Sequence, residues 1–173
     1  GAGGVGIMAI IALRSMGIKN IYAIDKNKKN LHSARKFGCK FTSNLEIFNK
    51  SIINKLINKN KIRYNVEISG NAQMMEMAIN NLSKNGSTIL AGNLKKGNLI
   101  KLNPYDLIFG KKVYGFSGND VSLEKNMNYY SKIIKKINLN KLRNIFSVYK
   151  FININKAVQD FKKGVVLRPL IKF

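Results

Sequence analysis

The sequence contains one cysteine and one histidine in 173 residues, and this scarcity excludes several kinds of site. Cys39 has no second cysteine to pair with, so no internal disulfide framework is possible, and a lone thiol fits a reducing, cytoplasmic compartment. With His32 as the only imidazole, the chain cannot assemble a three-residue His/Cys metal site from its own side chains. We therefore expect no metal ligands in this chain and interpret Cys39 as a small buried hydrophobic residue.

Long apolar runs are also missing. No stretch approaches the roughly 20 apolar residues that span a bilayer, so we expect no membrane segment. No basic-then-apolar leader precedes the first glycines, although we interpret the start of the chain as truncated and draw no conclusion from this. Hydrophobic residues still make up 45% of the sequence, which predicts a globular chain with a substantial core.

Acidic residues are scarce as well, with eight Asp and Glu against 31 Lys and Arg, for a net charge of +23. Such a balance is typical of proteins that bind nucleic acid or anionic surfaces. Here, however, the lysines are dispersed through every predicted element among many asparagines and isoleucines, a bias that low-GC coding produces. We interpret the charge as a solvated surface and keep a basic, nucleic-acid-binding module as the alternative.

A glycine-rich stretch opens the chain and leads directly into an apolar helix. Gly1, Gly3 and Gly6 have the G-x-G-x-x-G spacing of a dinucleotide-binding turn, although the hexapeptide alone equally fits an ordinary loop. In that motif the amides at the helix start and the positive end of the helix dipole face the phosphates. We therefore predict pyrophosphate contacts from Gly1, Gly3, Gly4, Val5 and Gly6.

The residues that follow support the dinucleotide interpretation. We predict a helix over 7–16 that ends at Gly17, then a strand over 20–24 that ends at Asp25. Asp25 lies about 20 residues beyond the glycines, where a carboxylate accepts hydrogen bonds from the adenosine ribose and repels a 2′-phosphate. The alternative is a simple turn residue before Lys26. The pattern predicts NAD rather than NADP.

Helices and strands alternate further along the chain. We predict helices over 28–37, 45–58 and 72–82, and strands over 39–42, 64–68 and 88–91. This alternation is typical of an open parallel sheet covered on both faces. The predicted fold class is therefore α/β, a Rossmann-type doubly wound parallel sheet that lacks its first strand, the one expected before Gly1.

Several predicted strands end in small or polar residues. Ligands of doubly wound sheets bind beyond the carboxyl ends of the strands, near the point where the strand order reverses. We therefore expect the strand-terminal residues to line one crevice against the cofactor: Asp25, Ser69, Gly70, Ala91, Gly92 and Asn93.

The pattern changes slightly after Gly97. We first predict an extended piece over 99–102, a helical turn at Asn103-Pro104 and a strand over 112–116. A helix capped by Asp120 or Ser122 and ending near 137 follows. The last predicted elements are an extended segment over 145–151, a helix over 155–161 ended by Gly164, and a strand over 167–173. We divide the chain into a dinucleotide-binding domain, residues 1–138, and a C-terminal segment, residues 139–173, that returns towards another domain.

Six short motifs follow one another: Gly1-Ala2-Gly3-Gly4-Val5-Gly6, Ala23-Ile24-Asp25, Ala34-Arg35-Lys36-Phe37-Gly38, Val66-Glu67-Ile68-Ser69-Gly70-Asn71, Lys111-Lys112-Val113-Tyr114-Gly115, and Ile154-Asn155-Lys156-Ala157-Val158 with Arg168-Pro169-Leu170. In this order they resemble the zinc-dependent medium-chain alcohol dehydrogenase family, across nearly the whole chain. The resemblance implies an NAD-binding Rossmann domain and a C-terminal segment that folds back towards a catalytic domain.

The resemblance also implies roles for individual residues. Asp25 would bind the adenosine ribose, and Arg168 would be a cationic contact to the pyrophosphate. Arg168 lies between Leu167 and Pro169 at the end of an apolar run, where a charge without a partner costs free energy. The alternative to the pyrophosphate contact is an ion pair at the surface. Residues 99–102 resemble the edge through which family members pair their sheets, so we expect a homodimer or homotetramer.

The family's zinc ligands and much of its proton relay would precede Gly1, so the resemblance implies zinc only in the intact protein and no catalytic residue in this chain. We expect the C-terminal portion of an NAD-dependent dehydrogenase that interconverts an alcohol and an aldehyde or ketone, inactive by itself. Asn30 is neutral where relatives often place a basic ribose contact, although Lys28 and Lys29 are near. A zinc-free, NADPH-dependent quinone-reductase-like member is the enzymatic alternative.

Overall fold

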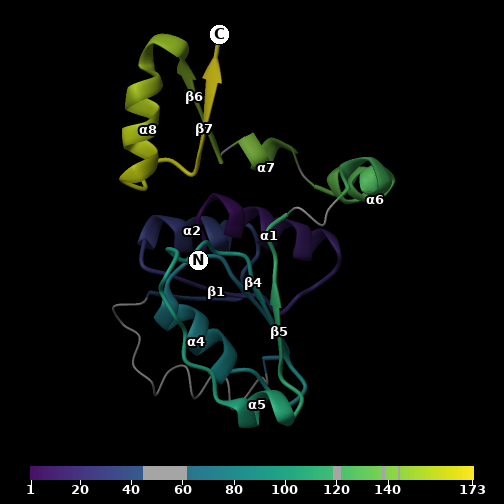
Figure 1. The fold of residues 1–173 in the computed structure, drawn as a ribbon. Helices are drawn as coiled ribbons and strands as arrows, with labels where there is room; N and C mark the ends of the chain where they lie inside the picture. The colour runs from purple at the N-terminus through teal and green to yellow at the C-terminus, as the bar shows by residue number, and fades with distance from the viewer. Residues whose placement is uncertain (45–61, 119–121, 138, 144) are drawn as a thin grey trace. The chain divides into compact units, whose positions relative to one another are not determined.

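The computed structural model describes residues 1–44, 62–118, 122–137, 139–143 and 145–173 (Figure 1). The chain forms two compact units, one of Gly1 with Glu46–Leu123 and the other of Ala2–Leu45 with Glu124–Phe173. The predicted helix over 45–58 lies outside the described residues. The predicted domain boundary after residue 138 stays a prediction.

The unit that contains Ala2–Leu45 begins with two helices and two strands: α1 (Gly4–Ser15), β1 (Tyr22–Asp25), α2 (Lys28–Lys36) and β2 (Phe41–Asn44). The strands are parallel, with Tyr22 opposite Phe41 and Asp25 opposite Asn44. Gly17 follows α1 at a φ of 88°, a left-handed conformation that ends a helix at little cost only for glycine. Because Gly17 and Gly38 both have positive φ, the predicted ends of the first two helices are confirmed.

The C-terminal half of the same unit contributes the elements α6 (Leu123–Lys135), α7 (Leu139–Arg143), β6 (Phe146–Lys150), the 3-10 turn η2 (Phe151–Asn153), α8 (Ile154–Lys162) and β7 (Arg168–Lys172). Strands β6 and β7 are parallel, with Phe146 opposite Arg168. Helix α8 packs against both strands and makes the crossover between them (Figure 1). The sequence analysis predicted these segments but neither their pairing nor the short helix α7.

Apolar side chains from both halves form the core of this unit. Its buried members are Ala2, Ile7, Ile10, Ile11, Ile21, Ala23, Ala34, Cys39 and Ile145. Ile145, only 2% exposed, anchors the C-terminal half to the N-terminal half. Cys39 is buried as expected, and this burial raises the pKa of its thiol to about 11, although Arg14 opposes the shift.

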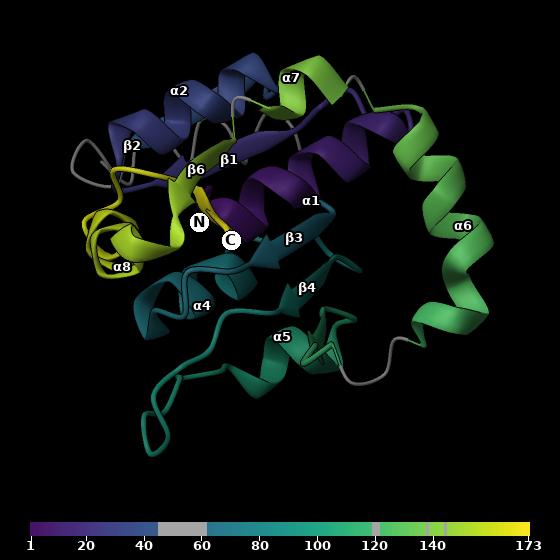
Figure 2. The ribbon, with the colours of Figure 1, turned by 90° about the horizontal axis from the view of Figure 1, so that it is seen from above.

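The other unit is a three-stranded parallel sheet with two helices: β3 (Tyr64–Glu67), α4 (Ala72–Asn80), β4 (Ser87–Leu90), α5 (Pro104–Ile108) and β5 (Lys112–Gly115). The strand order is β3-β4-β5, with Tyr64 opposite Ser87 and Ser87 opposite Lys112. Figure 2 shows α4 alongside β3 and β4, and its inward residues Met75, Ala78 and Ile79 are buried.

The segment predicted as an extended piece, residues 99–102, pairs with no strand of the described residues, and Leu99 is 86% exposed. The backbone amide of Lys101 donates to the carboxylate of Glu76 at 2.8 Å. Pairing of this segment with a second chain stays a prediction.

The α/β class with parallel sheets is confirmed. Every strand pair in the described residues is parallel, as the alternation of helices and strands predicted. These strands form three separate ladders, β1-β2, β3-β4-β5 and β6-β7. Parallel pairing places the carboxyl ends of the strands of each ladder at the same edge, where Asp25, Ser69 and Ala91 lie at or just after strand ends.

Candidate functional site

The glycine-rich turn ends where α1 begins. Gly3 is the N-cap of this 12-residue helix, with no side-chain cap and no acidic residue in the first turn. The first amides of a helix have no partner within the helix, so here they can donate to a ligand. Val5 in the first turn is 54% exposed. The amino end of α1 therefore has the properties of an anion-binding position.

The glycines of the turn differ in the space around them. A Cβ added at Gly4 would lie 2.7 Å from the carbonyl oxygen of Leu167, and one at Gly1 would lie 3.0 Å from the amide nitrogen of Ser69. At Gly3 nothing would lie within 4 Å, and Gly6 is buried. Close packing thus excludes a side chain at position 4, whereas the space beside Gly3 is open to a ligand.

Asp25 lies at the carboxyl end of β1 and is only 8% exposed. Its Oδ2 accepts a hydrogen bond from the amide of Ala2 at 2.6 Å, and its Oδ1 accepts one from the amide of Asn27 at 2.7 Å. Within the described residues, no lysine or arginine forms an ion pair with this carboxylate. Each oxygen keeps a second lone pair, so Asp25 holds the glycine turn and can still accept hydrogen bonds from a ligand.

Arg168, the first residue of β7, extends to the same turn. Its Nε would lie 3.2 Å from a Cβ added at Gly4, so its side chain lies against the amino end of α1. No acidic side chain in the described part of the chain forms an ion pair with it, and its role as an anion contact stays a prediction. The structure thus brings together the glycine turn and an arginine more than 160 positions away in the sequence.

The remaining predicted contacts belong to the other unit and follow β3 and β4. Ser69 and Gly70 come after β3, and Gly70 has a φ of 67°. Ala91 and Gly92 come after β4, and their amides both donate to the backbone oxygen of Glu67, at 2.8 and 3.0 Å. A Cβ added at Gly92 would lie 2.8 Å from the carbonyl carbon of Ile68. These strand ends are therefore packed closely against each other.

Glu67, the last residue of β3, is a feature of this unit that sequence reasoning missed. Its side chain is 4% exposed, and its Oε1 accepts hydrogen bonds from the amide, at 2.7 Å, and the hydroxyl of Ser69. The available signal was a carboxylate two residues before a Ser-Gly pair at a strand end, because that spacing lets the side chain reach the amides of the following turn.

The predicted site residues are therefore divided between the two units. Ala2–Gly6, Asp25 and Arg168 belong to one unit, while Gly1, Ser69, Gly70, Ala91 and Gly92 belong to the other. Asn93 contacts Gly70 through its carbonyl oxygen within that second unit. A single crevice lined by both groups stays a prediction.

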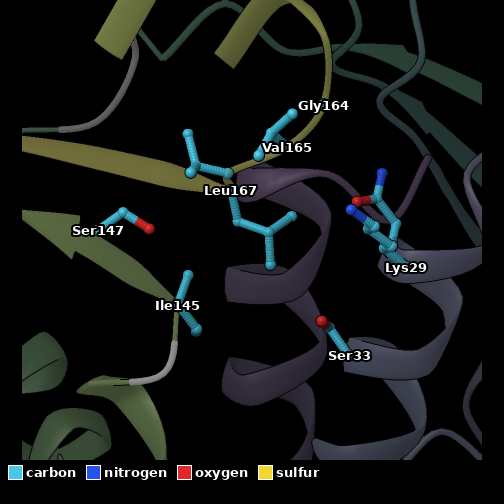
Figure 3. A pocket seen from close by; sticks show the side chains of 9 residues that line it. Lys29, Ser33, Ile145, Ser147, Gly164, Val165 and Leu167 are labelled. Atoms are coloured by element: carbon cyan, nitrogen blue, oxygen red, sulfur yellow. The ribbon is translucent and has the colours of Figure 1, made fainter. Parts of the chain in front are cut away.

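A cavity of about 150 Å³ lies beside α2 in the unit that holds Asp25 (Figure 3). Its lining comprises Lys29, Asn30, Ser33, Ile145, Ser147 and residues 164–167. The side-chain amide of Asn27 donates to the carbonyl of Gly164 at 3.3 Å at its edge. The cavity places Lys29 and Asn30 beside the turn that precedes Arg168, which their distance in the sequence does not suggest.

Neither a metal-binding cluster nor a membrane-spanning helix is found among the described residues. No group of three or more His, Cys, Asp or Glu side chains there is arranged to hold a metal ion. None of the helices described here is both long enough and apolar enough to cross a membrane.

Comparisons with known proteins identify the family of this chain. Residues 4–136 match the family model described as zinc-binding dehydrogenase. The chain is 25% identical to the rabbit (Oryctolagus cuniculus) alcohol dehydrogenase class-2 isozyme 2, over 99% of its own length and 46% of that enzyme. It is 29% identical to an S-(hydroxymethyl)glutathione dehydrogenase of Escherichia coli O1:K1, over 64% of this chain and 31% of that enzyme.

Solved structures show the same fold. Benzyl alcohol dehydrogenase from Acinetobacter calcoaceticus matches with a TM-score of 0.89 and 24% identity, over all of this chain and 48% of that chain. An alcohol dehydrogenase from E. coli CFT073, determined in complex with NADH, matches with a TM-score of 0.84 and 15% identity, over all of this chain and 50% of that one.

The chain thus spans about half the length of these structures. The family model covers most of the described elements, from α1 to α6. The resemblance rested on six short motifs in family order, from the glycine turn at the start of the chain to the segment around Arg168. That resemblance is confirmed, and the chain belongs to the zinc-binding dehydrogenase family.

Proposed function

We propose that this chain is the NAD-binding portion of an alcohol dehydrogenase that transfers hydride between an alcohol and NAD, forming an aldehyde or ketone. The observation that carries the proposal is the Asp25 carboxylate, buried at the end of β1 and bonded to the amide of Ala2 in the glycine turn. A carboxylate in this place accepts hydrogen bonds from both hydroxyls of an adenosine ribose. The relatives named above, which are alcohol dehydrogenases, support the reaction class.

The pyrophosphate of the cofactor would bind at the amino end of α1. The unpartnered amides there donate to phosphate oxygens, and the open space beside Gly3 lets the backbone approach them. Arg168, which lies against Gly4, would add a bidentate cationic contact. Contacts from Ser69, Gly70, Ala91 and Gly92 in the other unit are part of the same proposal.

NAD, when bound, supplies the hydride acceptor, and the residues of this chain bind and orient it. The described residues include no cluster that could hold zinc, so we derive no step through a metal from this chain. The chemistry at the alcohol oxygen therefore belongs, in this proposal, to groups outside the described residues.

Asp25 also determines the expected cofactor preference. A 2′-phosphate on the ribose would meet a buried carboxylate that no lysine or arginine of the described residues pairs with, and two like charges at contact repel each other. This argument favours NAD and counts against the NADPH-dependent, quinone-reductase-like alternative.

Calorimetric titration of NAD and NADP into the purified chain tests the proposal. We expect saturable binding with NAD preferred. In Asp25→Asn, NAD should bind about tenfold more weakly and the gap to NADP should narrow, because hydrogen bonds to a charged acceptor contribute about 1.5–3 kcal/mol. The conservative change keeps one oxygen to accept from the Ala2 amide.

Glu124→Gln is the matched control, because it removes the same charge from an exposed position on α6. It should leave both affinities unchanged. An NAD/NADP ratio that stays the same in Asp25→Asn would contradict the assignment of Asp25, and absence of dinucleotide binding by the unmodified chain would contradict the proposed function itself.

A further inference from the structure

One polar side chain joins the end of β1, where Asp25 lies, to the turn that carries Arg168. We propose that Asn27 is a positioning residue: it holds this turn so that Arg168 meets the pyrophosphate of the dinucleotide. The inference rests on the proposed function and goes beyond it, because it gives a role to a residue outside the predicted contacts. All the residues that it uses belong to the unit that contains Ala2–Leu45.

The side chain of Asn27 makes two hydrogen bonds of opposite polarity. Its Oδ1 accepts from the amide of Lys29 at 2.9 Å and caps α2, and its Nδ2 donates to the carbonyl of Gly164 at 3.3 Å. Because the cap uses the oxygen, the NH₂ group faces Gly164, where a carbonyl is the partner that it needs. The backbone amide of Asn27 donates to Oδ1 of Asp25 at 2.7 Å. Asn27 is thus tied to three segments of the chain.

The turn between α8 and β7 is held at both ends (Figure 3). Gly164 follows α8 with a φ of 66°, and a Cβ added there would lie 2.8 Å from Nδ2 of Asn27. At the other end, the carbonyl oxygen of Leu167 lies 2.7 Å from the position of a Cβ added at Gly4. Arg168 is the next residue and begins β7. The bond from Asn27 therefore limits where the backbone of Arg168 can lie.

This bond gives Arg168 a direction that the other contacts do not supply. Pairing with Phe146 on β6 orients Arg168 only within the C-terminal half of the unit. Leu167 packs against the core that both halves share, but apolar burial is not directional. The hydrogen bond from Asn27 joins the two halves beside Asp25 and is directional. A guanidinium needs such orientation, because its bidentate contact with phosphate oxygens depends on geometry as well as charge.

The test is a double-mutant cycle on NAD affinity, measured by calorimetry with the whole chain. Asn27→Ser keeps a good N-cap for α2, but its side chain is one bond shorter and lacks the amide that donates to Gly164. We expect NAD to bind about two- to tenfold more weakly, the range that one hydrogen bond supplies. In a chain that already carries Arg168→Ala, the same substitution should change the affinity by less than about twofold.

A second variant breaks the same bond from its other side. Gly164→Ala would place a Cβ against Nδ2 of Asn27, so it should also weaken NAD binding, and its effect should also disappear with Arg168→Ala. Asn153→Ser is the matched control, because it makes the same change at the exposed N-cap of α8, where the side chain forms no capping bond. It should leave NAD affinity unchanged. Urea unfolding of each variant separates loss of the fold from loss of affinity.

Equal weakening by Asn27→Ser with and without Arg168→Ala would show that Asn27 acts through the cap of α2 or through Asp25, and would overturn this inference. Unchanged NAD affinity in Asn27→Ser or in Arg168→Ala would overturn it as well. These results leave the proposed function intact, because the unmodified chain still binds NAD. Absence of NAD binding by the unmodified chain would contradict the proposed function itself, and this inference with it.

Discussion

At the scale of single residues, the molecule uses its few acidic side chains in an unusual way. Asp25 and Glu67 are both buried at strand ends, in a chain with 31 lysines and arginines, and backbone amides rather than cations satisfy them. Such carboxylates hold the backbone of a turn, because each hydrogen bond ties the carboxylate to one amide of the following or preceding loop. Each carboxylate oxygen can still accept a hydrogen bond from a ligand through the lone pair that the amide does not use.

Spacing along the sequence was enough to predict Asp25 but not Glu67. The role of Asp25 follows from its distance to the glycines and its place after an apolar strand. Glu67 precedes the Ser69-Gly70 pair by two residues, but this spacing alone does not separate an exposed carboxylate from one that folds back on its own turn. Arg168 was predicted through the family resemblance, and only the folded chain brings it against Gly4.

Neighbouring glycines of the turn should respond differently to the same substitution. Gly4→Ala places a methyl group 2.7 Å from the carbonyl oxygen of Leu167, so the free energy of unfolding should fall by about 1–3 kcal/mol. Gly3→Ala meets no atom of the protein within 4 Å and should leave stability unchanged or slightly higher, but NAD affinity should drop about tenfold. Urea unfolding and calorimetry measure the two quantities.

Gly115→Ala is the control for the stability of both glycine variants, because an added Cβ on β5 also meets nothing within 4 Å. It should change the free energy of unfolding little. Equal loss of stability in Gly3→Ala and Gly4→Ala would contradict the difference in packing on which this prediction depends.

At the scale of elements, local signals predicted helices well and strand pairing poorly. Apolar periodicity and positive-φ glycines mark α1 and α2, since both signals act within a few residues. The pairing of β6 with β7 depends on the crossover through α8, and the extended piece over 99–102 has no strand partner within the described residues. The residues of a strand do not by themselves determine which strand it pairs with.

Asparagine caps are a recurrent local device of this chain. Asn27, Asn71 and Asn103 precede α2, α4 and α5, and each side chain accepts from an amide in the first turn. The many asparagines were attributed to a compositional bias, but three of them also act as helix N-caps. These caps satisfy amides that would otherwise lack partners.

The cap of α4 offers a test of this device. Asn71 accepts from the amide of Met74 at 3.1 Å, so Asn71→Ala should lower the free energy of unfolding by about 1 kcal/mol. Asn71→Asp should retain most of it, because a carboxylate accepts the same bond and interacts favourably with the helix dipole. Asn80→Ala, at the exposed end of the same helix, is the control; an equal loss there would contradict a capping role.

At the scale of the whole molecule, the net charge of +23 is the property that the proposed function leaves unexplained. Basic residues lie in helices, strands and connecting loops of both units, and none of them is among the buried residues described. This distribution matches a solvated surface rather than one focused patch. The alternative, a nucleic-acid-binding module, makes a different prediction about salt.

Binding of an unrelated DNA duplex separates the two interpretations. A dispersed surface charge should give weak binding that disappears by about 0.2 M salt, since counterion release is then the main contribution. Saturating NAD should leave this weak binding unchanged. Fluorescence anisotropy of a labelled duplex measures both effects, and tight binding that persists at 0.2 M salt would support a dedicated nucleic-acid site.

The bond between Asp25 and the amide of Ala2 has a consequence for anyone who would redesign the cofactor preference. The usual first step towards NADP acceptance is to delete the acidic side chain. In this chain that deletion would also remove the acceptor of the Ala2 amide, so the proposed cofactor discrimination and the geometry of the glycine turn depend on the same side chain. A successful exchange therefore needs a second substitution that restores an acceptor for Ala2 before a cation is introduced for the extra phosphate.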